Sequence, residues 1–269
     1  MRYRARERGR WAVQLPGQKD EIRRFYAAET HDRDQSEWIA SGGSAHVPEN
    51  AAARYFLRRK VTTALELTGL GRASAVLEVG SSWGHQTFLL AERVAHVTGV
   101  DLSSESINLA RRRAAHWVVP NVRFEVADAE DLAGHADASF DGVLSFSTLR
   151  FCPQPERALS EMYRVLRSGG RLAVDFPNAA CPWYGPLKRG LGISPHIHDR
   201  LFTGVEAQAL VEQAGFTDVR RRALLFTSKR VPGAMLPAFR LLDLVGERIP
   251  GLRDLAGIVM VSGRKRAAG

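Results

Sequence analysis

The sequence predicts an α/β fold in which a mostly parallel sheet carries helices on both of its faces. Short apolar runs alternate with segments of helical periodicity over residues 75–176, as in a series of βαβ units. Residues 75–79 (AVLEV) and 97–101 (VTGVD) are apolar enough to form buried parallel strands. Between them, the small residues 80–84 (GSSWG) allow the sharp turn of a first crossover.

Two helices are expected before this core. Residues 1–19 are polar and basic, which predicts a mobile arm. Residues 20–28 have the periodicity of a short amphipathic helix, and residues 51–67 have that of a longer one. Residues 31–50, between the two helices, have the composition of a loop.

The core itself follows as alternating strands and helices. The predicted strands are 75–79, 97–101, 122–127, 140–146 and 171–176, and the predicted helices are 84–95, 103–116 and 154–167. Ser103 is expected to be the N-cap of the second of these helices. Residues 168–170 (SGG) predict a glycine C-cap for the third.

The segments after the core continue the alternation less regularly. Residues 177–201 are rich in proline and glycine, which argues against a long helix, and they leave the sheet at the edge where α/β folds bind ligands. Thr203 is expected to cap a helix that ends near Gly215. Residues 219–226 and 257–264 are the predicted sixth and seventh strands.

The connection 228–256 is too long for a turn and too apolar for disorder. It predicts a helix of about three turns that places Leu236, Phe239 and Leu242 on one side and Arg240 on another. The helix either packs on the sheet edge as a structural element, covers a long apolar ligand, or touches a membrane surface through residues 233–248.

The turn after the first strand discriminates between two classes of nucleotide-like ligand. Dinucleotide sites use a Gly-x-Gly-x-x-Gly turn that admits a pyrophosphate, but here Ser82 stands at the middle glycine and His85 at the third. Glu78, just before the turn, would repel phosphates, whereas it favours a cationic ligand such as S-adenosylmethionine (SAM), which carries a sulfonium and an ammonium group. Asp101, at the end of the next strand, can accept hydrogen bonds from a ribose diol.

The chain resembles the class I SAM-dependent methyltransferases over residues 70–176. Their first motif, an acid followed by Gly-x-Gly-x-Gly, is similar to residues 78–84 (EVGSSWG) apart from Ser82. Asp101 is similar to the acid of the family's next motif, and the pair Asp128-Ala129 is similar to a third motif. Residues 140–174 resemble the corresponding block of quinone-biosynthesis and natural-product methyltransferases. The resemblance implies a Rossmann-like, seven-stranded, mostly parallel sheet whose last strand is antiparallel.

The resemblance also implies how SAM is bound. Asp101 would take the ribose hydroxyls, Asp128 the adenine amino group, and a nearby backbone N–H the adenine ring nitrogen. The residues expected to bind the cofactor are Glu78, Gly80, Ser81, Trp83, Gly84, Asp101, Leu102, Asp128, Ala129 and Phe146. No metal is expected, because the sulfonium is already a good leaving group and the reaction needs mainly positioning.

These expectations divide the chain into an N-terminal arm and helical cap (1–69) and a methyltransferase domain (70–269) that contains a substrate loop (177–201) and a helical insertion (228–256). We expect methyl transfer from SAM to a small-molecule or lipid-like acceptor. One alternative is an RNA methyltransferase, which the net charge suggests. Another is a non-catalytic SAM-fold subunit that binds a partner, which Ser82 suggests.

The composition of the chain limits the kinds of binding partner and the cellular location that we expect. The net charge of +9 and the pI near 10.1 suit anionic partners, but the arginines do not form one dense block, which argues against nucleic acid. The fourth strand is followed by Ser-Phe-Ser-Thr rather than by the Asn-Pro-Pro-aromatic motif of RNA enzymes. No secretory signal or membrane span is evident, and the two cysteines have no metal-binding spacing, so a cytoplasmic protein is expected. The sequence indicates no oligomeric state.

No catalytic residue is assigned from the sequence. An acceptor hydroxyl or carbon acid would need a base, and His198 in the 177–201 loop is the candidate. Other side chains that could line the acceptor pocket are Tyr26, Trp38, His46, Trp183, Tyr184 and His196.

Overall fold

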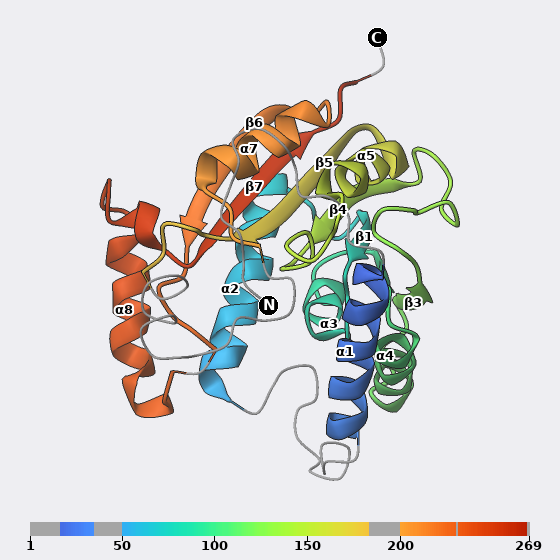
Figure 1. The fold of residues 1–269 in the computed structure, drawn as a ribbon, viewed down its shortest axis with the longest axis horizontal. Coiled ribbons are helices and arrows are strands. Elements are labelled where there is room, and N and C mark those ends of the chain that lie inside the picture. The colour runs from blue at the N-terminus through green and yellow to red at the C-terminus, as the bar shows by residue number, and fades with distance from the viewer. Residues whose placement is uncertain (1–16, 35–49, 183–199, 230, 268–269) are drawn as a thin grey trace.

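The computed structural model describes residues 17–34, 50–182, 200–229 and 231–267. They form a seven-stranded sheet of order β3-β2-β1-β4-β5-β7-β6, in which β7 runs antiparallel to both of its neighbours, β5 and β6 (Figure 1). The strands are β1 (Ala75–Val79), β2 (His96–Asp101), β3 (Val122–Val126), β4 (Phe140–Ser145), β5 (Leu166–Pro177), β6 (Thr217–Leu224) and β7 (Ile258–Arg264). The predicted fold class and the antiparallel last strand are confirmed.

Helices cover both faces of the sheet (Figure 1). Their bounds are α1 (Gln18–Asp34), α2 (Ala51–Thr68), α3 (His85–Ala91), α4 (Ser104–His116), α5 (Pro155–Val165), α7 (Gly204–Gln213) and α8 (Leu236–Gly246), with short 3₁₀ turns η1 (Gly233–Met235) and η2 (Arg253–Leu255). Val76 packs with buried side chains of α2 and α3, whereas its neighbour Leu77 packs with those of α5 and α7. Successive strand residues point to opposite faces, so β1 is covered on both sides, as its apolar sequence predicts.

Both of the expected side-chain N-caps are present. The Ser103 side chain accepts a hydrogen bond from Ser106 N at 3.1 Å at the start of α4. Thr203 and Glu206 form a reciprocal capping box at the start of α7. Each of these bonds satisfies a backbone N–H that has no partner within its helix.

The predicted glycine C-cap at residues 168–170 is wrong. The chain leaves α5 before these glycines and enters β5 directly. Lys265 Nζ instead donates to the carbonyl oxygens of Tyr163, Arg164 and Leu166 at 2.8, 3.2 and 2.8 Å. A cation from the far end of the chain therefore satisfies the helix end, where a positive charge also opposes the helix dipole.

Helix α8 is attached to the rest of the protein by two carboxylates. Asp243 is fully buried and accepts hydrogen bonds from Phe226 N (2.6 Å), Thr227 N (3.1 Å) and the Thr227 hydroxyl (2.5 Å). Glu247 accepts from Leu225 N at 2.9 Å and forms a 2.5 Å ion pair with Arg59 of α2. The helix thus fixes the loop that follows β6.

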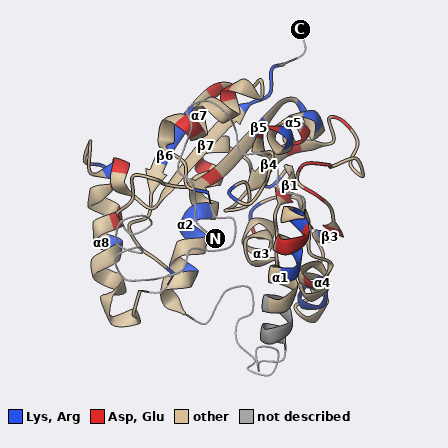
Figure 2. Ribbon diagram, in the orientation of Figure 1, with Lys and Arg blue, Asp and Glu red and all other residues tan. Residues whose placement is uncertain are grey.

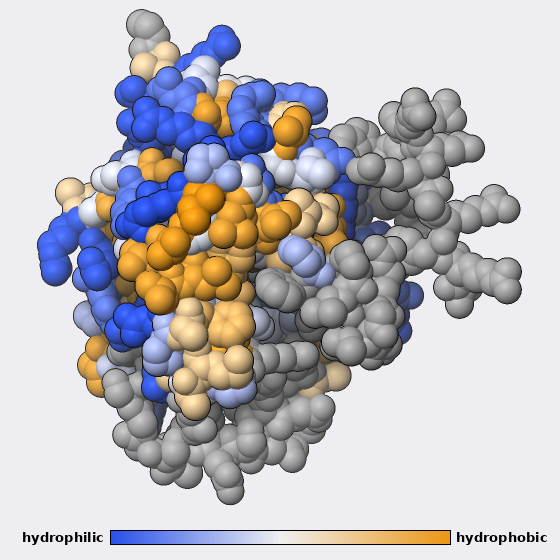
Figure 3. Space-filling model, turned by 90° about the vertical axis from the view of Figure 1, so that its left-hand side faces the viewer, coloured by the Kyte–Doolittle hydropathy of each residue, from blue (hydrophilic) through white to orange (hydrophobic). Residues whose placement is uncertain are grey.

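Most apolar side chains of α8 point away from this attachment. The exposed ones on and beside the helix are Met235, Leu241, Leu242, Leu244, Val245 and Ile249. They form the hydrophobic patch visible in Figure 3. Because the carboxylates occupy the inward face, the helix cannot also direct its apolar face toward the sheet. No helix among the described residues is long and apolar enough to cross a bilayer.

Asp243→Ala is expected to destabilise the protein, because it removes the acceptor of two buried backbone N–H groups and one hydroxyl. The free energy of unfolding should fall by about 3 kcal/mol, which lowers the melting temperature by roughly 6–12 °C. Asp254→Ala, on the exposed part of the same insertion, is the control and should melt like the parent. An Asp243→Ala protein with unchanged melting would show that the loop does not depend on α8.

Candidate functional site

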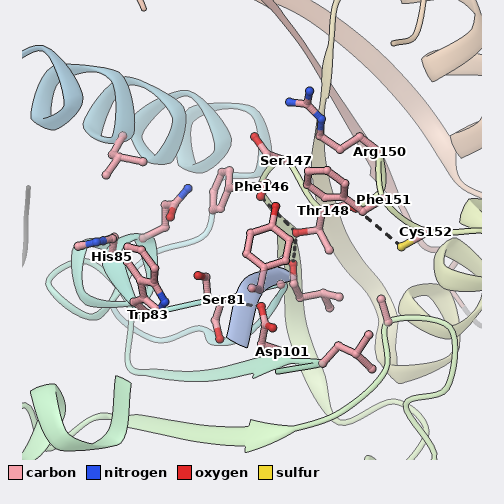
Figure 4. A pocket seen from close by; sticks show the side chains of 18 of the residues that line it. Ser81, Trp83, His85, Asp101, Phe146, Ser147, Thr148, Arg150, Phe151 and Cys152 are labelled. Atoms are coloured by element: carbon pink, nitrogen blue, oxygen red, sulfur yellow. Dashed lines mark hydrogen bonds between the residues drawn. The ribbon is translucent and has the colours of Figure 1, made fainter. Parts of the chain in front are cut away.

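A cavity of about 940 Å³ opens at the carboxyl ends of β1, β2 and β4. The strand order reverses between β1 and β4, and ligands of open α/β sheets bind at such a point. Residues of α1, α2, the β1–α3 turn, the segment after β4 and the loop after β6 line it (Figure 4). Both N-terminal helices therefore contribute to the cavity wall.

The turn after β1 needs its glycines. Gly80 has φ +83°, and a Cβ on it would lie 1.9 Å from the Thr148 hydroxyl oxygen. Gly84 has φ +84°, and its Cβ would lie 2.8 Å from the Phe124 ring. Ser82 also has a positive φ, +47°, at the position where the resembling motif has its middle glycine. The turn therefore keeps a left-handed residue at this position despite the departure from the motif.

Asp101 ends β2 at the floor of the cavity. Its Oδ2 accepts from Ser82 N at 2.9 Å and its Oδ1 accepts from Ser103 N at 3.0 Å. Burial raises the pKa of Asp101, and these backbone hydrogen bonds oppose that rise. Each carboxylate oxygen can accept more than one hydrogen bond, so the group is held in place and still has lone pairs for a ligand's hydroxyls.

Glu78 lies behind the turn and is not among the described residues that line the cavity. Its side chain is fully buried, and the Thr87 hydroxyl donates to Oε2 at 2.5 Å. Oε1 has no hydrogen-bond partner among the described residues. Burial raises the pKa of Glu78 to about 8, although the Thr87 hydrogen bond and the Lys60 charge oppose that rise. Burial alone therefore favours the neutral carboxyl group, and a cation bound on the other side of the turn would favour the charged carboxylate.

Asp128 lies at another end of the cavity, under α1. Its Oδ1 accepts from Glu130 N at 2.9 Å. Lys19 of α1 places its Nζ 2.5 Å from Asp128 Oδ2 and 2.6 Å from Glu130 Oε2. This ion-pair network attaches α1 over the end of the cavity formed by β3.

The opposite side of the cavity is apolar and basic. Its aromatic wall consists of Phe56, Phe146 and Phe226, and the cationic residues there are Arg150 and Lys229. The described carboxylates that line the cavity are Asp101, Asp128 and Glu130, all at the ends of β2 and β3. The cavity therefore has an acidic end and a basic, aromatic end.

Most of the residues expected at the cofactor site line this one cavity. They are Gly80, Ser81, Trp83, Asp101, Leu102, Asp128, Ala129 and Phe146. Glu78 and Gly84 support the turn from behind it. Tyr26 also lines the cavity, whereas Trp38, His46, Trp183, Tyr184, His196 and His198 lie outside the described residues.

No described residue of α8 lines the cavity, so the interpretation of Phe239 as part of a lid receives no support. The sequence motifs do not include the residues behind the basic end, above all Lys60 and Asp175. A signal existed in each case: Lys60 interrupts the buried stripe of α2, and Asp175 interrupts the apolar run of β5.

Comparison with known proteins assigns the family. A family described as "Methyltransferase domain" matches residues 77–174. The chain is 34% identical over 164 residues to the O-methyltransferase rstn1 of Aspergillus nomiae, covering 55% of this chain and 69% of that protein. It is 31% identical over 182 residues to the S-adenosyl-L-methionine-dependent Diels-Alderase iccD of Talaromyces variabilis, covering 62% of this chain and 61% of that protein.

A solved structure extends the similarity to the whole fold. The magnesium protoporphyrin IX methyltransferase ChlM of Synechocystis PCC 6803, with bound S-adenosylhomocysteine (SAH), superimposes with a TM-score of 0.63 at 17% identity, covering 92% of this chain and 99% of that chain. At this identity the match shows the fold alone. The sequence relatives are matched over less of their length, 61% for the Diels-Alderase. Together, the family match and the relative covered over most of its length show that this chain belongs to the class I SAM-dependent methyltransferase family.

Proposed function

We propose that the protein transfers a methyl group from SAM to a small-molecule or lipid-like acceptor. The observation that carries this proposal is the division of one cavity into an acidic end and an aromatic, basic end. The acidic end offers hydrogen-bond acceptors for a nucleoside, and the other end offers room for an apolar molecule. A cavity of this size can enclose two small molecules together.

The residues present fit the cofactor. We assign the ribose hydroxyls to Asp101, whose carboxylate is already oriented by two backbone hydrogen bonds. The adenine amino group is assigned to Asp128, with Ala129 beside it, and the amino-acid part of SAM to the turn at Gly80 and Ser81. Glu78 lies behind the turn, where a cationic ligand would lower its raised pKa and favour the charged carboxylate.

The reaction needs little chemistry from the protein. SAM supplies an activated methyl group, and the electron pair of the breaking S–C bond stays on sulfur. The acceptor must be held in line with that bond and shielded from water. The aromatic wall and α1, attached through Lys19 to Asp128 and Glu130, support this shielding role.

The distribution of charge favours a small acceptor over RNA. Lys and Arg are interspersed with Asp and Glu over many elements rather than gathered on one surface (Figure 2). We also propose that residues 1–69 act as a cap on a methyltransferase domain of residues 70–269, which the cavity contacts of α1 and α2 support. A cytoplasmic location is proposed as well, since neither Cys152 nor Cys181 forms a disulfide.

Asp101→Ala is expected to weaken SAM binding by roughly 2–3 kcal/mol, or about 30- to 150-fold, through loss of charge-assisted hydrogen bonds. Calorimetry with SAM and with NADH measures this, and Asp131→Ala, an exposed carboxylate near the same sheet edge, is the matched control. In parallel, methyl-labelled SAM and a small-molecule cell extract should give a labelled product with the parent but not with Asp101→Ala.

Three outcomes would contradict parts of this proposal. Tight binding of NADH without binding of SAM would overturn the cofactor assignment. Label found only in RNA would overturn the acceptor class. SAM binding without any transferred label would favour a non-methylating use of the cofactor site, a possibility raised by the similarity to a SAM-dependent Diels-Alderase.

We further propose that residues 233–248 contact an anionic membrane surface. The exposed apolar side chains of α8 lie beside the exposed Arg240 and Arg248, an arrangement typical of interfacial helices. The net charge of +9 favours anionic rather than neutral lipid.

The double variant Leu241→Glu/Leu244→Glu should therefore reduce sedimentation with phosphatidylserine-containing vesicles by about tenfold. It replaces two apolar side chains that would enter the lipid surface with negative charges that the anionic lipid repels. Val205→Glu, at an apolar residue 67% exposed on α7, is the matched control and should bind like the parent. Equal binding by all three proteins, or binding that ignores the lipid charge, would contradict the assignment.

A further inference from the structure

A buried ion pair lies behind the basic end of the cavity. Lys60 Nζ of α2 is 2.6 Å from Asp175 Oδ2 of β5, and the two side chains are 1% and 0% exposed. Lys60 Nζ also donates to Ser147 Oγ at 2.8 Å. Ser147 itself lines the cavity, on the side away from Asp101 (Figure 4). The Lys60 ammonium group, whose charge Asp175 balances, therefore contacts the cavity lining through one hydroxyl group.

The hydrogen bonds that Ser147 Oγ already makes determine whether it can donate its proton to a ligand. An ammonium group only donates, so Lys60 occupies a lone pair of Ser147 Oγ, and the hydroxyl must give its own proton elsewhere. Among the described residues, the acceptor nearest to this hydroxyl is Asp175 Oδ1, 3.4 Å from Ser147 Oγ. The same oxygen already accepts a hydrogen bond from Ser147 N at 2.6 Å. A separation of 3.4 Å exceeds the usual range for an O–H···O bond. The proton is thus available to a ligand, and the hydrogen bond that the hydroxyl accepts from Lys60 polarises it and makes it a stronger donor.

The backbone holds this donor in an unusual conformation. Ser147 has φ +59°, in the left-handed region that serine rarely occupies. The short hydrogen bond from Ser147 N to Asp175 keeps it there. Strained residues of this kind cluster at ligand-binding sites, where the surrounding structure fixes them.

The surroundings define the class of ligand. Lys60 Nζ lies 5.5 Å from the centroid of the Phe56 ring and 5.6 Å from that of Phe146, and both rings line the cavity beside Ser147. Arg150 and Lys229 add positive charge to the same end, whereas the described carboxylates of the lining lie at the cofactor end. Apolar rings, a polarised donor and cationic neighbours together suit an aromatic anion.

We propose that Ser147, with Lys60 behind it, determines acceptor specificity by donating a hydrogen bond to an anionic oxygen. The acceptor class is then an aromatic or otherwise apolar molecule that carries a phenolate, enolate or carboxylate. This inference rests on the proposed function and refines it. Ser147 contacts the acceptor, and Lys60 acts as a positioning residue through Ser147.

The test uses SAH, which occupies the cofactor end without reacting, and two probes of nearly equal shape, 2-naphthoate and the neutral 2-naphthamide. Calorimetry on the SAH-saturated full chain should give at least about tenfold tighter binding of 2-naphthoate, because a hydrogen bond to a charged group is the stronger one. Ser147→Gly removes the hydroxyl and tolerates the left-handed backbone. It should abolish most of this preference while SAH affinity and melting temperature stay close to those of the parent.

Two further variants separate recognition from folding. Lys60→Met/Asp175→Asn removes both buried charges together and should lower the preference for 2-naphthoate although Ser147 is present. Ser145→Ala removes a buried hydroxyl that donates to Val79 O at 2.8 Å, outside the cavity lining, and should leave the preference unchanged even if it lowers the melting temperature.

Four results would overturn the inference. In the first two, the parent binds SAH but shows equal affinity for the two probes or no affinity for 2-naphthoate. In the third, the preference for 2-naphthoate survives in Ser147→Gly. All three leave the proposed cofactor site intact. Failure of SAH itself to bind would instead overturn the proposed function, and the inference with it.

Discussion

The Lys60–Asp175 ion pair connects an N-terminal helix to the centre of the sheet, and much of the cavity depends on it. Transferring two charges out of water is costly, and their attraction offsets that cost only when the geometry is good. Here Lys60 bridges Asp175 and Ser147 between two aromatic rings. The pair thereby fixes α2 over β5, sets the backbone of the segment after β4 and opposes the raised pKa of Glu78.

The cavity in front of this pair has two ends, one lined by carboxylates and the other by aromatic and cationic side chains. Backbone N–H groups orient the carboxylate of Asp101 at one end, and Lys19 closes that end by pairing with Asp128 and Glu130. At the other end, the loop after β6 contributes Phe226 and Lys229 to the wall. Helix α8 serves this end indirectly, because the buried Asp243 holds the start of that loop.

The sequence predicted what depends on local pattern. Buried strands, the β1–α3 turn, the Ser103 cap and the acids at the ends of β2 and β3 all follow from short motifs. It could not predict contacts between distant residues. Lys265 caps α5 from about a hundred positions away in the sequence. Lys60 pairs with Asp175 across a similar distance in the sequence. The orientation of α8 could not be predicted from the sequence either. Its periodicity defines an apolar face, but it does not show that Asp243 and Glu247 bind the loop after β6 and so turn that face outward.

A crystal structure with SAH tests the central claim most directly, because every functional statement depends on which end of the cavity holds the cofactor. The account predicts the ribose hydroxyls on Asp101, the adenine amino group on Asp128, and the sulfur directed toward the end of β4 and Ser147. SAH bound with its adenine among Phe56, Phe146 and Phe226, or bound outside this cavity, would contradict it.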